Sequence, residues 1–166
     1  MAEALRPEPI VRFEHVTKTF PGIRALDDVS FSIQEGEVHC LLGENGAGKS
    51  TLMKILTGVY HAESGSVYLR GKKVEVGDIH QAQQLRIGTV FQENSLIPHM
   101  TVAENVAIGK EPRHGLLLDL EQVIQKIHQF SRDFGLDLDP ERYIWQLSAG
   151  EQQRVEIFKA LYRGAD

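Results

Sequence analysis

The stretch that decides the fold is Val38-His39-Cys40-Leu41-Leu42-Gly43-Glu44-Asn45-Gly46-Ala47-Gly48-Lys49-Ser50-Thr51. Its first part, residues 38–42, is a short apolar run, and continuous apolarity over that length favours a strand buried on both faces of a parallel α/β sheet. From Ser50 onward the apolar residues return at helical spacing, at Leu52, Ile55, Leu56 and Val59. The sequence therefore predicts a buried strand, a glycine-rich loop and a helix, in that order.

The loop between this strand and this helix fits the pattern G-x-x-x-x-G-K-[ST] from Gly43 to Ser50. Glycines let the backbone curl so that successive N–H groups point at phosphate oxygens, and the helix that follows adds its positive amino-terminal end. In such a loop Lys49 reaches the β- and γ-phosphates, and the Ser50 hydroxyl is a Mg²⁺ ligand. The alternative is a chance match in a turn, which the strand–loop–helix context disfavours. The loop predicts the binding of a nucleoside triphosphate.

Composition and charge narrow the class of protein. The chain has 166 residues, 42% of them hydrophobic and 25% charged, which is ordinary for one globular domain. Lys and Arg number 18 against 23 Asp and Glu, so the net charge of −5 argues against a nucleic-acid binder. The one cysteine, Cys40, has no internal disulfide partner and fits a reducing compartment. We expect a soluble cytosolic protein, because no apolar run reaches the ~20 residues of a membrane span.

The rest of the chain is strand-rich at first and helical later. Alternating or short apolar runs predict strands at residues 11–16, 29–33, 66–69, 73–76 and 87–91. Helical spacing predicts a helix over 120–134, and Ser148-Ala149-Gly150-Glu151 is a capping box that opens a last helix. We therefore divide the chain into residues 1–92, a phosphate-loop core with an antiparallel β subdomain, and 93–166, a helical subdomain.

The segment Leu147-Ser148-Ala149-Gly150-Glu151-Gln152-Gln153 resembles the signature motif of ATP-binding-cassette (ABC) ATPases, about a hundred residues after the phosphate loop. A Ser and a Gly at an exposed helix amino terminus offer a second anion site, with backbone N–H groups and the Ser148 hydroxyl aimed outward. The alternative is that the capping box merely starts a helix. The resemblance covers essentially the whole chain and implies an α/β P-loop NTPase with an antiparallel β subdomain and a helical signature subdomain.

The resemblance also implies the site residues and the assembly. In the family the signature of one cassette closes over ATP held by the phosphate loop of another, so a head-to-tail dimer is expected. Gln92 matches the Q-loop glutamine, which senses Mg²⁺ and the attacking water. Lys49 and Gln92 are then catalytic, and Ser50 and Gln92 serve the metal. The nucleotide-binding residues are Phe20, which would stack on adenine, Gly43, Asn45, Gly46, Ala47, Gly48, Lys49, Ser50 and Thr51, with Ser148, Gly150 and Glu151 acting on the second cassette's ATP.

Two stretches, 96–105 and 150–157, resemble the amino-terminal cassette of tandem sugar-importer ATPases, a group that serves ribose, galactose, arabinose, xylose and nucleosides. This resemblance implies ATP and Mg²⁺ as cofactors and membrane permease subunits as partners, with a periplasmic or extracellular solute-binding protein as an indirect partner. It also implies a cytoplasmic place on the inner face of the membrane. The acidic net charge predicts no nucleic-acid partner.

The family's catalytic Asp-Glu pair, at the end of an apolar strand after the signature helix, has no counterpart in these 166 residues. We therefore expect little ATPase activity from this chain. Without the carboxy-terminal part of the core sheet, the strands predicted at 38–42 and 87–91 would have unpaired edges and exposed apolar faces. Two alternatives stay open: a nucleotide-binding module without turnover, and a non-transport ABC ATPase of DNA repair or translation.

Overall fold

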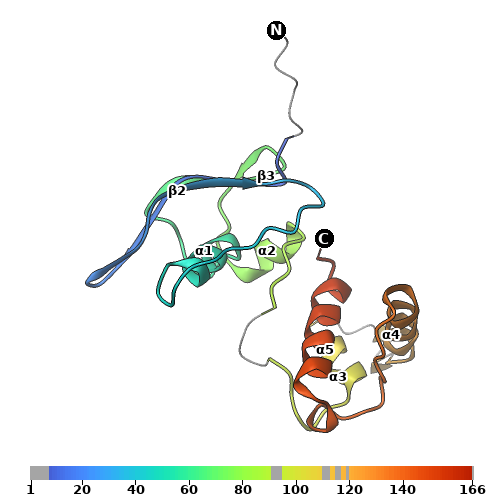
Figure 1. Ribbon diagram of the computed structural model, residues 1–166. Coiled ribbons are helices and arrows are strands. Elements are labelled where there is room, and N and C mark those ends of the chain that lie inside the picture. Colours follow the sequence, from blue (N-terminus) through green and yellow to red (C-terminus); the bar gives the residue numbers. More distant parts are fainter. Residues whose placement is uncertain (1–7, 91–94, 110–112, 115–116, 119, 166) are drawn as a thin grey trace. The chain divides into compact units, whose positions relative to one another are not determined.

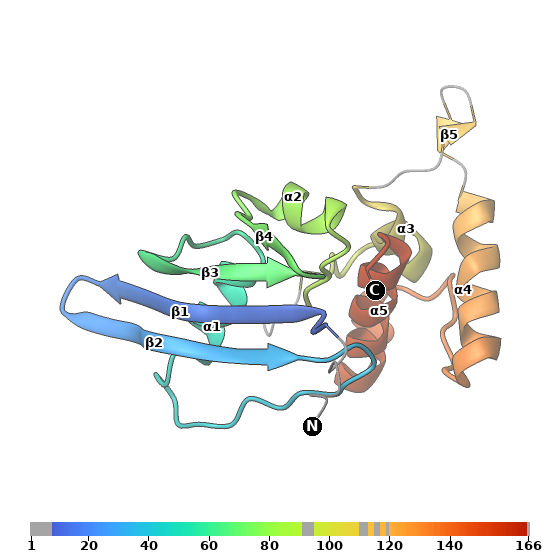
Figure 2. The same ribbon diagram turned by 90° about the horizontal axis from the view of Figure 1, so that it is seen from above.

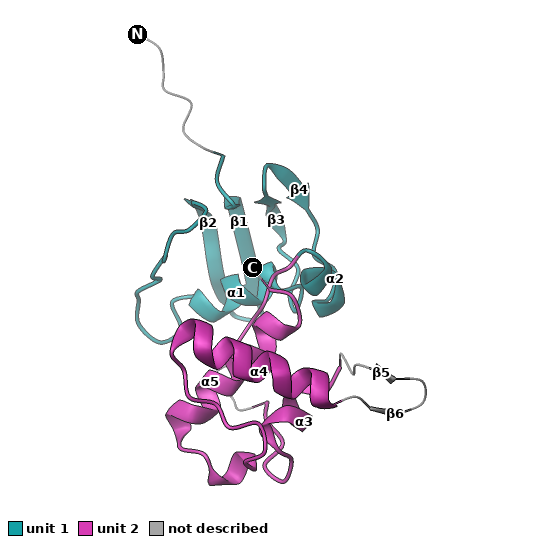
Figure 3. Cartoon of the chain, turned by 90° about the vertical axis from the view of Figure 1, so that its right-hand side faces the viewer, with its two compact units in different colours: residues 1–85 teal, residues 86–166 magenta. Residues whose placement is uncertain are grey.

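The computed structural model describes residues 8–90, 95–109, 113–114, 117–118 and 120–165. Its strands are β1 (Val11–Phe20), β2 (Ile23–Ile33), β3 (Ser64–Leu69), β4 (Lys72–Val74), β5 (Arg113–His114) and β6 (Leu117–Leu118). Its helices are α1 (Lys49–Leu56), α2 (Ile79–Gln84), α3 (Val102–Ala107), α4 (Leu120–Phe134) and α5 (Ala149–Tyr162), with a 3₁₀ turn at Ile144–Gln146. The chain forms two compact units, residues 1–85 and 86–166, coloured separately in Figure 3.

Unit 1 is built on an antiparallel sheet in the order β2-β1-β3-β4, whose strands lie side by side in Figure 2. The two-residue turn Pro21-Gly22 joins β1 to β2, and Gly22 supplies its positive φ of 81°. Helix α1 lies against one face of the sheet (Figure 1). The buried core between sheet and helix consists of Phe13, Val16, Leu26, Val67, Leu52 and Ile55. This core fixes the start of α1, and with it the phosphate loop, under the sheet.

The predicted strand at residues 38–42 is absent, which corrects the sequence-based expectation. Residues 37–44 have no regular secondary structure, and Val38 and Leu42 are 98% and 89% exposed. A strand needs a neighbour for its backbone N–H and C=O groups, and no strand among the described residues pairs with this segment. The apolar composition of residues 38–42 predicted a buried strand. The observed exposure of Val38 and Leu42 agrees with the exposed apolar face that we expect for this segment.

The strand predicted at residues 87–91 is also absent over its described part. Residues 87–90 have no regular structure, and Phe91 lies outside the described residues. The reason is the same, because no described strand offers this segment a ladder of hydrogen bonds. The division between the compact units falls at residues 85 and 86, ahead of the predicted boundary at 92 and 93.

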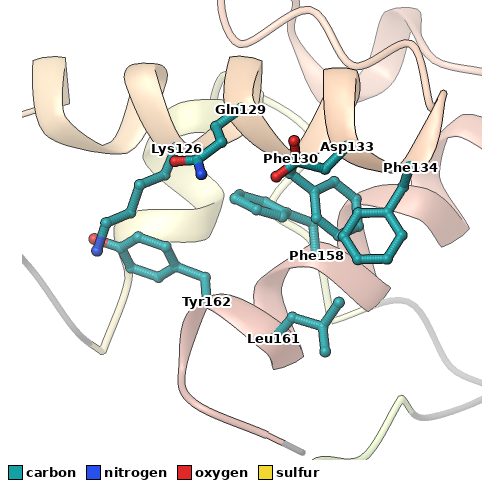
Figure 4. Close-up of a pocket in the computed structure, with 8 residues that line it drawn as sticks. All are labelled: Lys126, Gln129, Phe130, Asp133, Phe134, Phe158, Leu161 and Tyr162. Carbon is teal, nitrogen blue, oxygen red and sulfur yellow. The ribbon is translucent and has the colours of Figure 1, made fainter.

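Unit 2 is a helical unit in which α3 packs against both α4 and α5. The predicted helix over 120–134 is confirmed, and Gly135 follows it with a φ of +63°. Its core is formed by buried aliphatic and aromatic side chains from the three helices: Val102, Val106, Val123, Ile127, Phe130, Val155 and Phe158. Toward the carboxyl ends of α4 and α5 the side chains labelled in Figure 4, among them Phe134 and Tyr162, line a cavity of about 270 Å³.

A ladder of backbone hydrogen bonds joins two loops of unit 2. One loop precedes and enters α3, and the other precedes α5; Thr101 and Tyr143 form an antiparallel bridge between them. The N–H groups of Val102, Ala103, Ile144 and Trp145 donate to the carbonyls of Arg142, Pro140, Met100 and Pro98 over 3.0, 3.0, 3.1 and 3.2 Å. The start of α5 is therefore built on the loop that starts α3.

The side chain of Asn105 is hydrogen-bonded to the backbone of the loop that precedes α3. This side chain is 0% exposed; Oδ1 accepts the N–H of Ile97 at 2.7 Å, and Nδ2 donates to the carbonyls of Ile97 and Thr101 at 3.1 and 3.0 Å. All three partners are backbone groups of the loop. One buried amide therefore satisfies three backbone groups that have to turn without regular structure.

Replacing Asn105 by alanine is expected to lower the free energy of unfolding of unit 2 by about 2–3 kcal/mol, because buried backbone groups lose their partners. Urea denaturation followed by circular dichroism measures this change. Gln153→Ala, an exposed substitution on α5, is the control and is expected to change stability by less than about 0.5 kcal/mol. Equal effects of the two substitutions would contradict a structural role for the Asn105 amide.

Candidate functional site

The phosphate loop, residues 43–50, is exposed over most of its length. It turns at Glu44, whose carbonyl accepts the N–H of Ala47 at 3.2 Å, and Gly46 and Gly48 follow with φ values of +89° and +83°. Both angles lie in the left-handed region, where glycine adopts them at no steric cost. The backbone therefore curls as the motif predicts, with Asn45 and Ala47 on its exposed side.

Gly48 is also the point where the loop touches the sheet. A Cβ placed there would lie 2.3 Å from the carbonyl oxygen of Ala25 and 2.8 Å from Cδ2 of Leu26. At Gly46, by contrast, a Cβ would meet nothing within 4 Å. Gly48 is thus required by packing as well as by conformation, and it anchors the loop on β2.

The amino terminus of α1 is open. Its N-cap residue is Gly48, no side chain caps it, and no acidic residue stands in its first turn. The first N–H groups of a helix have no partner within the helix, and together with the helix dipole they attract anions. These features suit the binding of a phosphate group at this end of α1.

Lys49 lies across the phosphate loop. Its Nζ donates to the carbonyls of Gly43 and Glu44 at 2.7 and 2.8 Å, so the ammonium group sits on the loop itself. Ser50 is exposed beside it, and Thr51 is half-buried. No group of three or more His, Cys, Asp or Glu side chains that could hold a metal ion occurs among the described residues.

Phe20 ends β1, directly before the Pro21-Gly22 turn. Its ring meets Tyr60 edge to face with the centroids 5.2 Å apart, and Lys18 Nζ lies 5.4 Å from its centroid. The ring is half-buried in unit 1, the same unit as the phosphate loop. It is therefore held in place while part of its surface stays accessible.

Ser148, Gly150 and Glu151 form the first turn of α5 in unit 2. The predicted capping box is confirmed, since Oε2 of Glu151 accepts both the N–H and the hydroxyl of Ser148 at 2.7 Å. The hydroxyl of Ser148 is therefore turned toward Glu151, and the prediction that it is aimed outward is wrong for this conformation. A Cβ at Gly150 would meet nothing within 4 Å, so the space beside it is open.

The pKa of Glu151 is lowered to about 2, mainly by the hydrogen bonds from Ser148 and further by the Arg142 guanidinium. A carboxyl with a depressed pKa stabilises the fold above its unfolded value near 4.5 and loses that contribution as pH falls toward 2. The Glu151 carboxylate in the capping box of α5 is therefore ionised at neutral pH.

Arg142 is a site residue that the sequence reasoning missed. Its Nη1 donates to Oε1 of Glu151 at 2.8 Å and its Nη2 to the carbonyl of Gln146 at 2.7 Å. No local spacing rule joins residues nine apart across a 3₁₀ turn, so the sequence carried no signal for this contact. Gln92, the predicted Q-loop glutamine, lies outside the described residues.

None of the helices in the described part of the chain is long and apolar enough to cross a membrane.

The sequence is similar to the xylose import ATP-binding protein XylG of Geobacillus kaustophilus (strain HTA426), with 44% identity over 158 residues, 94% of this chain and 31% of XylG. It is equally similar to the guanosine import ATP-binding protein NupO of Bacillus subtilis (strain 168), with 44% identity over 159 residues, 96% of this chain and 31% of NupO. The chain spans about a third of the length of these curated relatives.

A solved dimeric structure of the ATP-binding cassette MJ0796, in a post-hydrolysis state bound to ADP and Pi, resembles this fold with a TM-score of 0.73 and 32% identity. The likeness covers 93% of this chain and 70% of that one. It confirms the predicted α/β fold of a phosphate-loop cassette. The profile of the family described as "ABC transporter" matches residues 26–166. This chain belongs to the ABC transporter family.

Proposed function

We propose that this chain is the amino-terminal, ATP-binding part of an ABC importer subunit that couples ATP binding and hydrolysis to the uptake of a monosaccharide or related small solute. The observation that carries the proposal is the open amino terminus of α1 under a glycine loop, with Lys49 beside it. Free backbone N–H groups, a helix dipole and a nearby ammonium group are the features that bind a triphosphate.

In this site Lys49 would exchange the carbonyls of Gly43 and Glu44 for phosphate oxygens. The two carbonyl contacts already keep its ammonium group over the loop. Ser50 would offer its exposed hydroxyl to Mg²⁺, which would screen the charge of the phosphates. Gln92 would complete the metal and water site. Equilibrium titration with a fluorescent ATP analogue in the presence of Mg²⁺, competed with ATP and AMP, tests this proposal; equal competition by AMP would contradict it.

Phe20 would stack on the adenine, since its ring is held by Tyr60 at one of its sides. Base–aromatic stacking contributes roughly 1–3 kcal/mol by alanine substitution. Phe20→Ala is therefore expected to weaken ATP binding about 10-fold and to leave the binding of inorganic triphosphate unchanged. Phe20→Tyr, which keeps an aromatic face, is the control and is expected to bind ATP within about 2-fold of the wild type. Competition titrations with both ligands measure the difference, and equal losses for both would argue against stacking.

The first turn of α5 would receive the ATP of a second cassette in a head-to-tail dimer. Two observations support this pairing: Ser148 and Gly150 are exposed, and the similar cassette MJ0796 has a dimeric structure. Sedimentation of the chain with and without Mg-ATP tests this pairing. Pairing that is independent of nucleotide would contradict it.

The import function is supported by relatives named for the import of xylose and of guanosine. By this proposal the partners are permease subunits, with a solute-binding protein as an indirect partner, and the place of action is the cytoplasmic face of the membrane. The 166 residues hold the binding part of the chemistry, so we expect them to bind ATP with little turnover. Uptake of labelled xylose and guanosine by cells whose protein carries Lys49→Ala tests the import function, and unchanged uptake of both would contradict it for these two solutes.

A further inference from the structure

The two helix amino termini assigned to ATP differ in their side-chain caps and in their charge. That of α1 has no side-chain cap and no acidic residue in its first turn, whereas that of α5 contains Glu151. A carboxylate at a helix amino terminus stabilises the helix, but it also occupies the positive end that an anionic ligand would use. The second phosphate-facing end therefore carries a negative charge of its own.

The hydroxyl of Ser148 shows the consequence of this charge. It has a single hydrogen, which it donates to Oε2 of Glu151 at 2.7 Å, and the N–H of Ser148 goes to the same oxygen at 2.7 Å. A phosphate oxygen can accept a hydrogen bond from the Ser148 hydroxyl only if the hydroxyl hydrogen turns away from Glu151. Glu151 thus competes with the phosphate for Ser148 as well as repelling it.

Arg142 holds the other oxygen of the same carboxylate. Its guanidinium donates to Oε1 of Glu151 at 2.8 Å and to the carbonyl of Gln146 at 2.7 Å. The backbone of Arg142 is fixed as well, because its carbonyl accepts the N–H of Val102 at 3.0 Å. Arg142 is therefore anchored on both sides, and its positive charge lies against the negative charge of Glu151.

We propose that Arg142 is a positioning residue of the signature turn. It balances the charge of Glu151 and keeps a hydrogen bond to the carboxylate when the Ser148 hydroxyl turns to an ATP phosphate of the second cassette. This inference rests on the proposed function. It predicts that Arg142 matters for pairing only while a carboxylate stands at position 151.

A double-mutant cycle on the 166-residue chain tests the inference, with Mg-ATP-dependent pairing measured by sedimentation equilibrium. Arg142→Gln is expected to weaken pairing about 10-fold, because the carboxylate is left unbalanced near a polyanion. In the Glu151→Gln background, where the capping box is retained by a neutral amide, the same change is expected to alter pairing by less than about 2-fold. The loss caused by Arg142→Gln alone is expected to shrink at high salt, since exposed charges are screened.

Three further measurements make the result decisive. Far-UV circular dichroism of each variant checks that its helices are folded, so that a loss of pairing is not mistaken for a general loss of folding. Arg132→Gln, which removes an exposed charge from α4, is the charge-matched control and is expected to pair as the wild type does. Carboxyl NMR is expected to show that the pKa of Glu151 rises in Arg142→Gln, in the absence of ATP.

Each outcome has one meaning. If Arg142→Gln weakens pairing equally with and without the Glu151→Gln substitution, or leaves the pKa of Glu151 unchanged, the role of Arg142 is overturned and the proposed function stays intact. A wild-type chain that does not pair with Mg-ATP would contradict the proposed second-cassette site, and with it any role of Arg142 toward ATP. Restored pairing in the double variant Arg142→Gln with Glu151→Gln would support the inference.

Discussion

Lys49→Ala is expected to weaken the binding of Mg-ATP by about 10- to 100-fold. The ammonium group is the one positive charge that the structure places on the phosphate loop, residues 43–50, where Nζ contacts the carbonyls of Gly43 and Glu44. A hydrogen bond to a charged group contributes roughly 1.5–3 kcal/mol, which corresponds to this range of affinity. Truncation removes the charge and leaves the glycine loop and the α1 amino terminus in place.

Titration with a fluorescent ATP analogue measures the loss. Lys72→Ala is the matched control, because Lys72 lies exposed on β4 in the same unit and has the same charge. We expect Lys72→Ala to bind ATP within about 2-fold of the wild type, since charges separated by more than about 10 Å or exposed to water are largely screened. Affinities of Lys49→Ala and Lys72→Ala that agree would show that the loop does not bind a triphosphate as proposed.

Gly48→Ala is expected to lower the free energy of unfolding of unit 1 by more than about 3 kcal/mol. The left-handed conformation costs a residue with a Cβ roughly 1–2 kcal/mol. In addition, the new Cβ would lie 2.3 Å from the Ala25 carbonyl oxygen, which is backbone of β2 and cannot move aside without disturbing the sheet. The substitution therefore strains the loop and its anchor together.

Gly46→Ala separates these two costs. Its φ of +89° is close to the +83° of Gly48, but its Cβ would meet no atom within 4 Å. We expect it to lose only about 1–2 kcal/mol, the conformational part. Urea unfolding of both variants measures the difference, and equal midpoints would mean that the contact with β2 contributes nothing to stability.

Local signals predicted most of the helices and strands. The apolar spacing of Val123, Ile124 and Ile127 predicted α4. The box from Ser148 to Glu151 predicted the start of α5. The same box pattern at Thr101 and Glu104 starts α3 and could have located that helix. These signals work because periodicity and caps depend on residues within one or two turns.

Signals that depend on distant partners failed. Residues 38–42 have the composition of a buried strand, but a ladder requires neighbours, and Val38 is exposed instead. Arg142 was missed for a related reason, because its contact with Glu151 depends on a turn that tertiary hydrogen bonds fix. The loop motif predicted the conformation at Gly46 and Gly48, since positive φ is a local property.

The hydrogen-bond ladder between the loop of Thr101 and the loop of Tyr143 has a mechanical consequence. Its four backbone bonds contribute about 1 kcal/mol each, so separating the two loops costs several kcal/mol, whereas moving them together costs none of it. We therefore expect a displacement of the start of α3 to move Arg142 as well, because Arg142 lies in the second loop and contacts Glu151 in the first turn of α5. The two loops are expected to move as one body, and Ser148 follows the second of them at the start of α5.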